Sequence, residues 1–197
     1  MEKNISVSTG RKTISRITLI ALFAALTAAG TFVSIPLPFS PVPVVLQNMF
    51  TVLSGLILGP LGGSLAVGLY LLAGALGAPV FAGASGGFAR FLGPTGGFLL
   101  GYLLSALVAG LIAGRPRTEK RTPGTGRTLG RIILATTLAF LVIYIPGLLR
   151  LKQLMDLGWT EAVAAGFLPF LIGDTLKGIV AVSIAPRLRL VIAELLS

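Results

Sequence analysis

Long apolar segments, separated by short polar or proline-rich breaks, make up most of this chain. No charged residue occurs from Ile17 to Ala89, a stretch of 73 residues. A transmembrane helix needs about 20 apolar residues, so this stretch can hold several helices, and proline and glycine mark the breaks between them. The pattern predicts an all-α integral membrane bundle, a single domain over residues 1–197 with six transmembrane helices, at 17–35, 44–58, 61–76, 95–113, 132–149 and 162–184.

The connections between these helices differ in character. Four prolines between residues 36 and 43 predict a loop, because each proline lacks the N–H that a helix needs. The glycine-rich stretch 80–93 predicts an ordered loop that carries the lone charge of Arg90. The stretch 115–127 predicts a polar loop, and 150–160 predicts a short amphipathic connection.

The composition and the charge distribution agree with a membrane protein. Hydrophobic residues are 54% of the chain and charged residues 11%, against about 25% charged in soluble domains, which excludes a water-soluble domain. With six helices, the two termini and the region 115–131 share one side, which holds twelve of the sixteen Lys and Arg residues. Basic residues concentrate on the cytoplasmic side of membrane proteins, so both termini are predicted to be cytoplasmic.

Several kinds of chemistry are excluded by residues that the chain lacks. It has no cysteine and no histidine, so it has no disulfide, no Cys/His metal site and no Ser-His or Cys-His catalytic pair. No G-x-x-x-x-G-K-[ST] phosphate-binding motif occurs. We therefore expect no catalytic residue, no cofactor and no metal, and we expect the net charge of +10 to reflect contact with the lipid bilayer rather than with nucleic acid.

Asp174 and Lys177 are the ionisable residues inside a predicted helix. Their i, i+3 spacing places them on one face, where they can neutralise each other. A charge in the bilayer is costly, so it usually faces a cavity and has a function, although a structural ion pair remains the alternative. Counting about 1.5 Å per residue from Arg187 places Asp174 about 20 Å into the membrane, in its outer half, so a site there would open to the outside.

Four other polar residues are candidates for ligand binding. Gln47 and Asn48 bring amide groups into an apolar helix, where they can bind a ligand or another helix. Tyr70 can line a pocket or lie at a membrane interface. Arg90 can bind a carboxylate or remain solvated.

Small residues four apart suggest close helix contacts, most of them inside the bundle. The first helix differs from the others, because its alanines cover more than one face: Ala21, Ala24, Ala25, Ala28 and Ala29. One stripe of this helix can therefore remain free for a partner protein.

Four motifs occur in a recognisable order along the chain. They are LPFSPVPVVLQNMFTVLSGLILGP (37–60), GAPVFAGASGG (77–87), GPTGGFLLGY (93–102) and PFLIGDTLKG (169–178). Together they resemble the BioY family, the biotin-specific substrate-capture (S) components of energy-coupling-factor (ECF) transporters. One departure is Phe98, where the family pattern leads us to expect tyrosine.

The resemblance implies a six-helix protein of the prokaryotic cell membrane that binds biotin in an outward-opening pocket. It also implies docking, through the alanine stripe of the first helix, on an ECF transmembrane coupling protein and two ATPases. In that case Asp174 with Gln47 or Asn48 suits the ureido group of biotin, and Lys177 or Arg90 suits its carbonyl or carboxylate. Two alternatives remain open: a self-sufficient secondary vitamin transporter that uses Asp174 for proton coupling, and a non-transporting scaffold with a structural ion pair.

Overall fold

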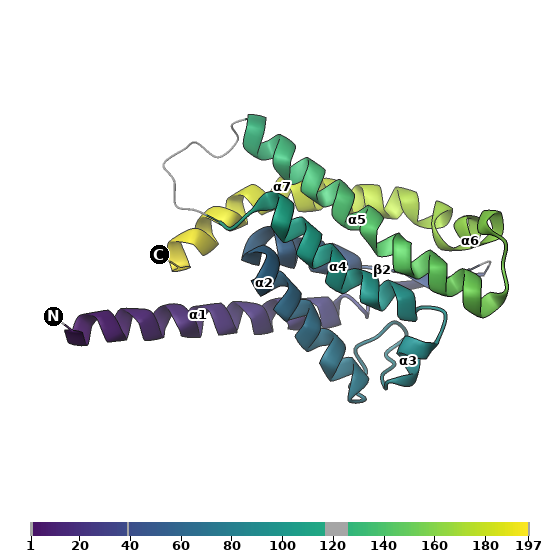
Figure 1. The fold of residues 1–197 in the computed structure, drawn as a ribbon, viewed down its shortest axis with the longest axis horizontal. Helices are drawn as coiled ribbons and strands as arrows, with labels where there is room; N and C mark the ends of the chain where they lie inside the picture. The colour runs from purple at the N-terminus through teal and green to yellow at the C-terminus, as the bar shows by residue number, and fades with distance from the viewer. Residues whose placement is uncertain (1, 39, 117–125, 197) are drawn as a thin grey trace.

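Helices make up nearly all of the structure, a computed structural model that describes residues 2–38, 40–116 and 126–196. The main helices are α1 (Glu2–Ala29), α2 (Gln47–Ala75), α4 (Gly96–Ala113), α5 (Gly126–Met155) and α7 (Leu171–Leu196). The shorter elements are strands β1 (Ser34–Leu37) and β2 (Ser40–Val45), helices α3 (Ala89–Leu92) and α6 (Trp159–Gly166), and the 3₁₀ turn Leu168–Phe170. Figure 1 shows the long helices side by side, with the N- and C-termini at the same end.

Helix α2 is a hairpin of two helical arms. Gly59 has φ 76° and ψ −177°, a backbone conformation that breaks the helix, and Pro60 opens the second arm. Gly63 then packs on Gly55: a Cβ atom on Gly63 would lie 2.6 Å from the Cα atom of Gly55. Five helical stretches of the described residues are long and apolar enough to cross a membrane, and the two arms of α2 bring the number of apolar helices to the predicted six.

Glycine allows α4 to pack closely on its two neighbours. A Cβ atom on Gly97 would lie 2.1 Å from the carbonyl oxygen of Pro146 in α5, and one on Gly110 would lie 2.3 Å from the nitrogen of Pro60 in α2. Side chains at these positions would push the helices apart. Small residues on α4 therefore serve packing within the bundle, with α4 between α2 and α5.

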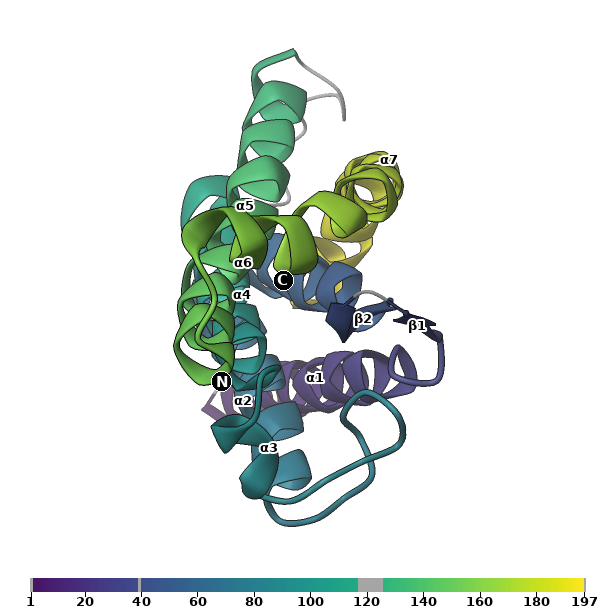
Figure 2. The same ribbon diagram turned by 90° about the vertical axis from the view of Figure 1, so that its right-hand side faces the viewer.

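The two ends of the bundle are built differently. We call the end with the two chain termini the terminal end. The opposite end, which we call the hairpin end, carries the β-hairpin of β1 and β2, α3 and the turn between α5 and α6 (Figure 1). Viewed from the hairpin end, the β-hairpin lies between α1 and α7 (Figure 2). The positive-inside prediction assigns the terminal end to the cytoplasm and the hairpin end to the outside.

Arg189 of α7 joins three helices at the terminal end. Its guanidinium donates hydrogen bonds to the carbonyl oxygens of Ala113 and Gly114 at the end of α4, both at 3.0 Å, and to that of Leu56 in the first arm of α2. The last carbonyls of a helix lack partners within the helix and carry partial negative charge. Arg189 therefore satisfies the ends of α4 and of the first arm of α2 at once.

The predicted proline loop is a β-hairpin instead. Strands β1 and β2 pair antiparallel, with Ser34 opposite Val45 and Leu37 opposite Ser40. Proline is tolerated in a two-stranded hairpin because each strand has an open edge that needs no N–H donor. The first helix accordingly ends at Ala29, before the predicted boundary at residue 35.

The last predicted helix, 162–184, is wrong at its start. Phe167 has φ −130° and ψ −56°, which ends α6, and Pro169 then lies in a 3₁₀ turn before α7 begins at Leu171. Proline cannot continue an α-helix from the preceding turn. The prediction also placed the end of the fifth helix six residues early, and it missed α3 within the glycine-rich loop. Residues 117–125 of the predicted polar loop lie outside the described residues.

Candidate substrate-binding site

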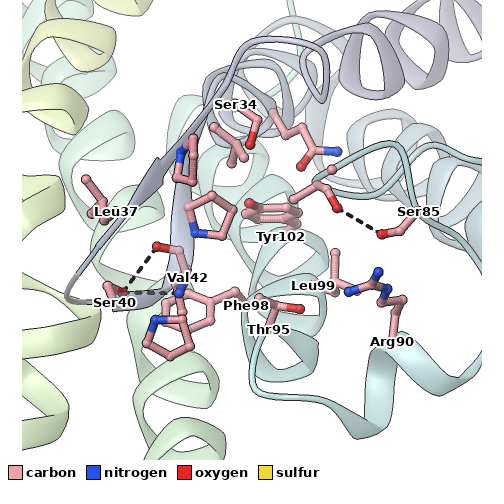
Figure 3. Close-up of a pocket in the computed structure, with 17 residues that line it drawn as sticks. Ser34, Leu37, Ser40, Val42, Ser85, Arg90, Thr95, Phe98, Leu99 and Tyr102 are labelled. Atoms are coloured by element: carbon pink, nitrogen blue, oxygen red, sulfur yellow. Dashed lines mark hydrogen bonds between the residues drawn. The ribbon is translucent and has the colours of Figure 1, made fainter.

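A pocket of about 410 Å³ lies at the hairpin end of the bundle. Its walls are the β-hairpin, the loop between α2 and α4, and the first turns of α4 (Figure 3). Pockets for small ligands typically have 300–1,000 Å³ and apolar walls with a few polar groups. By size, this pocket fits a single small molecule.

The walls of the pocket are mostly apolar, and its polar groups lie at different heights along α4. Prolines and valines of the β-hairpin face Phe98 and Leu99 of α4. Arg90 and Thr95 lie beside the start of α4, whereas Tyr102 lies two turns further along the helix. A ligand with an anionic end, an apolar middle and an uncharged polar end therefore matches this distribution.

Gln47 connects the pocket to both arms of α2 and to the loop that follows. Its Nε2 atom donates a hydrogen bond to the Tyr70 hydroxyl at 2.7 Å and another to the Val80 carbonyl at 2.9 Å, and it also contacts the Thr31 hydroxyl. The Thr31 hydroxyl in turn donates to Val80. Gln47 is 1% exposed and lines the pocket, so its amide is held in one orientation by the surrounding acceptors.

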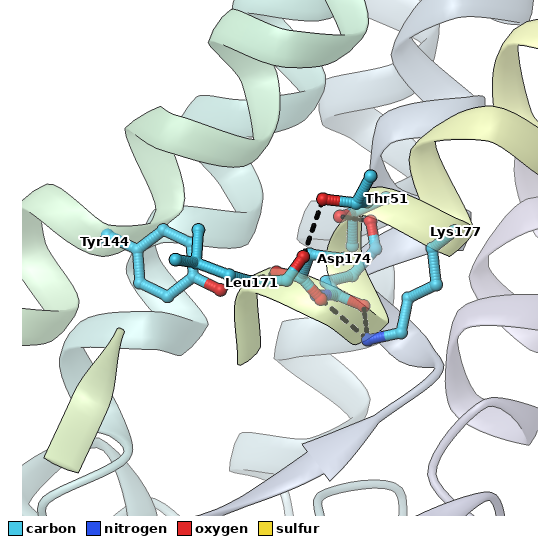
Figure 4. Close-up of polar contacts among 7 residues, drawn as sticks. Thr51, Tyr144, Leu171, Asp174 and Lys177 are labelled. Atoms are coloured by element: carbon cyan, nitrogen blue, oxygen red, sulfur yellow. Dashed lines mark hydrogen bonds and ion pairs between the residues drawn. The ribbon is translucent and has the colours of Figure 1, made fainter. Parts of the chain in front are cut away.

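A second polar group is centred on Asp174 of α7 (Figure 4). Its Oδ1 atom accepts hydrogen bonds from Asn48 Nδ2 and Lys177 Nζ, both at 2.8 Å, and its Oδ2 atom accepts one from the Tyr144 hydroxyl at 2.5 Å. Lys177 Nζ also donates to Asn48 Oδ1 at 3.0 Å. The Asp174 charge is thus neutralised by Lys177 and held by three helices: α2, α5 and α7.

The structure therefore separates the six predicted site residues into two adjacent groups. Gln47 and Arg90 line the pocket. Tyr70 does not line it, but its hydroxyl accepts a hydrogen bond from Gln47. Asn48, Asp174 and Lys177 are bonded to one another but do not belong to the pocket wall. The link between the two groups is local in sequence, because Gln47 and Asn48 are neighbours at the start of α2.

Three residues at the site escaped the sequence analysis. Tyr144 binds Asp174, Thr31 binds Val80, and Tyr102 lines the pocket. Tyr144 and Tyr102 lie inside apolar helices, where a tyrosine has the same pattern as any core aromatic residue. One signal was available, because the chain has three tyrosines and all of them belong to this region.

Phe98, the departure from the expected family pattern, lies in the pocket wall. Its ring meets that of Tyr144 edge to face, with the centroids 6.1 Å apart. Tyr144 in turn packs against Phe167 at 4.7 Å. The contact of Phe98 with Tyr144 therefore connects the pocket wall to the residue that donates a hydrogen bond to Asp174.

The alanines of α1 divide between two faces. Ala24 is buried against the bundle, while Ala21, Ala25 and Ala29 are exposed at intervals of one turn. Ala28 lies at the edge between the two faces. Within the described residues, the exposed stripe therefore remains open along the helix.

Apolar helices long enough to cross a membrane, with a pocket of small-molecule size at one end of the bundle, are typical of a multi-pass membrane protein. The sequence model of the BioY family matches residues 1–194. The chain belongs to the BioY family, which confirms the resemblance seen in its motifs; this is a family of transporters, not of enzymes.

Individual relatives agree with this assignment. The chain is 40% identical to "Probable biotin transporter BioY" of Pyrococcus horikoshii over 174 residues, 88% of this chain and 95% of that protein. It is 43% identical to "Biotin transporter BioY" of Rhodobacter capsulatus over 182 residues, 86% and 92% of the two chains. Among solved structures, the S-component for biotin from an ECF-type ABC transporter is similar, with a TM-score of 0.79, 29% identity, and 90% and 92% of the two chains covered.

Proposed function

We propose that this protein binds biotin at the pocket of the hairpin end and acts as the S component of an ECF transporter in the cell membrane. The observation that carries the proposal is the polar pattern of the pocket: the Arg90 guanidinium beside the start of α4, apolar walls, the Tyr102 hydroxyl two turns further along α4, and the Gln47 amide from the start of α2. Biotin has a carboxylate at the end of an alkyl tail, an apolar sulfur-containing ring and, fused to that ring, an uncharged ureido ring. Its three parts match this order.

The pattern implies an orientation for biotin. A carboxylate forms its strongest hydrogen bonds with a guanidinium, so the tail lies toward Arg90. The ureido ring then lies near Gln47 and Tyr102, with the sulfur-containing ring against Phe98 and Leu99. The Asp174 group supports this end of the pocket, because Asn48 follows Gln47 directly and is fixed by Asp174 and Lys177.

The sequence has no nucleotide-binding motif, so ATP-driven delivery inward needs a partner that binds ATP. We infer that it docks on an ECF transmembrane coupling protein with two ATPases. The exposed stripe of Ala21, Ala25 and Ala29 supports this, since small residues permit close approach of another helix.

Two experiments test the proposal. Mass spectrometry of small molecules released from the purified protein is expected to find biotin in stoichiometric amount, and calorimetry with the emptied protein is expected to show biotin binding. A folded protein that neither retains biotin during purification nor binds added biotin would refute the proposal. Uptake into vesicles with and without the partner module, in the presence of an uncoupler, separates ATP-driven delivery from proton-coupled transport through Asp174.

A further inference from the structure

Tyr102 of α4 has a hydroxyl group that the protein itself does not use. The residue is 6% exposed and belongs to the wall of the pocket. Within the described part of the chain its hydroxyl has no hydrogen-bond partner, whereas the hydroxyls of Tyr70 and Tyr144 are both bonded. A hydroxyl in the pocket wall without a protein partner is open to a ligand, and a hydrogen bond formed there adds to affinity. Figure 3 shows Tyr102 in the middle of the lining side chains.

The surroundings of Tyr102 favour an uncharged ligand group. Among the described residues that line the pocket, Arg90 of α3 supplies the cation, whereas Tyr102 offers a hydroxyl donor. A carboxylate forms stronger hydrogen bonds with the guanidinium of Arg90 than with a hydroxyl, so we expect it to bind at Arg90 rather than at Tyr102. A neutral carbonyl oxygen can accept a hydrogen bond from the Tyr102 hydroxyl.

The position along α4 also separates Tyr102 from the cationic end of the pocket. Tyr102 is seven residues beyond Thr95, which corresponds to about 10 Å along a helix. Arg90 lies at the Thr95 end. A ligand whose anionic tail reaches Arg90 therefore presents its opposite end to Tyr102.

We propose that the Tyr102 hydroxyl donates a hydrogen bond to the ureido carbonyl of biotin, which makes Tyr102 a specificity-determining residue of the pocket. The inference rests on the proposed function, which supplies the ligand, and adds a residue to the site. Its physical basis is that the Tyr102 hydroxyl is a donor without a protein partner, and that the ureido carbonyl is the uncharged acceptor of biotin farthest from the carboxylate.

The test measures the affinities of three variants, Tyr102→Phe, Arg90→Ala and Ser105→Ala, for biotin and for biotin methyl ester. Tyr102→Phe keeps the ring and breaks no hydrogen bond within the protein, so the variant is expected to fold normally. Its affinity for biotin and for biotin methyl ester is expected to fall by the same factor, about three- to ten-fold, the usual worth of one neutral hydrogen bond. Arg90→Ala is expected to weaken biotin but to leave the methyl ester unaffected.

Ser105→Ala is the matched control. Ser105 lies on the same helix, and its buried hydroxyl also has no partner among the described residues, but it is not in the pocket wall. The variant is expected to bind both ligands normally. Calorimetry on the purified proteins provides all of these affinities.

The outcomes separate this inference from the proposed function. If the unmodified protein binds biotin and Tyr102→Phe binds both ligands equally well, the role of Tyr102 is overturned while the proposed function stands. A loss for biotin but not for its methyl ester would place Tyr102 on the tail and overturn the assignment to the ureido group. If the unmodified protein binds no biotin, both proposals fail together.

Discussion

Gln47 and Tyr70 are hydrogen-bonded at 2.7 Å although they lie 23 positions apart, in the first and the second arm of α2. In a straight helix the two would lie about 35 Å apart. The reversal at Gly59 brings them together, and with them the amide that lines the pocket. The pocket therefore depends on a backbone turn at the opposite end of the bundle.

Gly59→Ala is expected to destabilise the protein by about 1–3 kcal/mol, because φ 76° with ψ −177° is a conformation that only glycine adopts readily. Gly68→Ala, in the second arm of the same hairpin, is the control. A Cβ atom on Gly68 would meet nothing within 4 Å, and alanine favours a helix. Thermal unfolding in detergent measures both variants. Equal melting temperatures for Gly59→Ala and the unmodified protein would show that the turn tolerates a side chain.

Asp174→Asn is expected to lower biotin affinity about ten-fold or more, because Asn48, the neighbour of Gln47 in the pocket wall, loses its hydrogen bond to a charged group, which is worth about 1.5–3 kcal/mol. It is also expected to reduce stability, because Lys177, 11% exposed, loses its counter-ion. Calorimetry and thermal unfolding measure the two effects separately.

The double variant Asp174→Leu with Lys177→Met distinguishes a binding role from a structural one. Replacing both members of a buried ion pair with apolar residues is often neutral for stability. We therefore expect stability close to that of the unmodified protein, with biotin affinity still reduced. If the folded double variant binds biotin normally, Asp174 and Lys177 have only a structural role.

Ala25→Trp is expected to abolish co-purification with the ECF module and ATP-driven uptake, because the indole would block close approach to the exposed stripe of α1. Biotin binding by the isolated protein is expected to persist, since α1 contributes no residue to the pocket wall. Ile133→Trp, on the exposed face of α5, is the control and is expected to retain both activities. Uptake that survives in Ala25→Trp would place the docking surface elsewhere.

Single cysteines at Ala84 and Gly126 test the topology, since the chain has no cysteine of its own. Both positions are exposed, Ala84 in the loop at the hairpin end and Gly126 at the start of α5. A membrane-impermeant thiol reagent is expected to label Ala84→Cys in intact cells and Gly126→Cys only after the membrane is opened. Labelling of both in intact cells would contradict six crossings with a cytoplasmic terminal end.

Arg189→Met is expected to destabilise the bundle by about 3 kcal/mol or more, because three carbonyl oxygens lose a charged donor. Arg189→Lys is expected to recover part of this loss, since a lysine ammonium lacks the planar fork of the guanidinium. Biotin affinity, measured well below the melting temperature, is expected to stay the same because Arg189 lies at the terminal end. A large loss of affinity would reveal coupling between the two ends.

The sequence was sufficient for the apolar helices because each is defined by local features. Proline at position 60 and glycine at 59 correctly divided the second and third helices. The prolines of residues 36–43 gave the wrong element, since a hairpin depends on pairing across the chain rather than on local preference. The contact of Tyr144 with Asp174 joins residues 30 positions apart on different helices, and no local pattern encodes such a contact.

The short first arm of α2 has a consequence for how the chain enters the membrane. Residues 47–58 form a helix of only about 18 Å, well below the roughly 30 Å of the hydrocarbon layer. Such a segment gains too little from lipid to insert alone, so the translocation machinery must receive the two arms as one helical hairpin. The charge-free stretch around them allows this, because neither arm carries a charged side chain that would resist partitioning. The ribosome would then have to synthesise the chain beyond Ala75, the end of α2, before the first arm could reach its final position in the membrane.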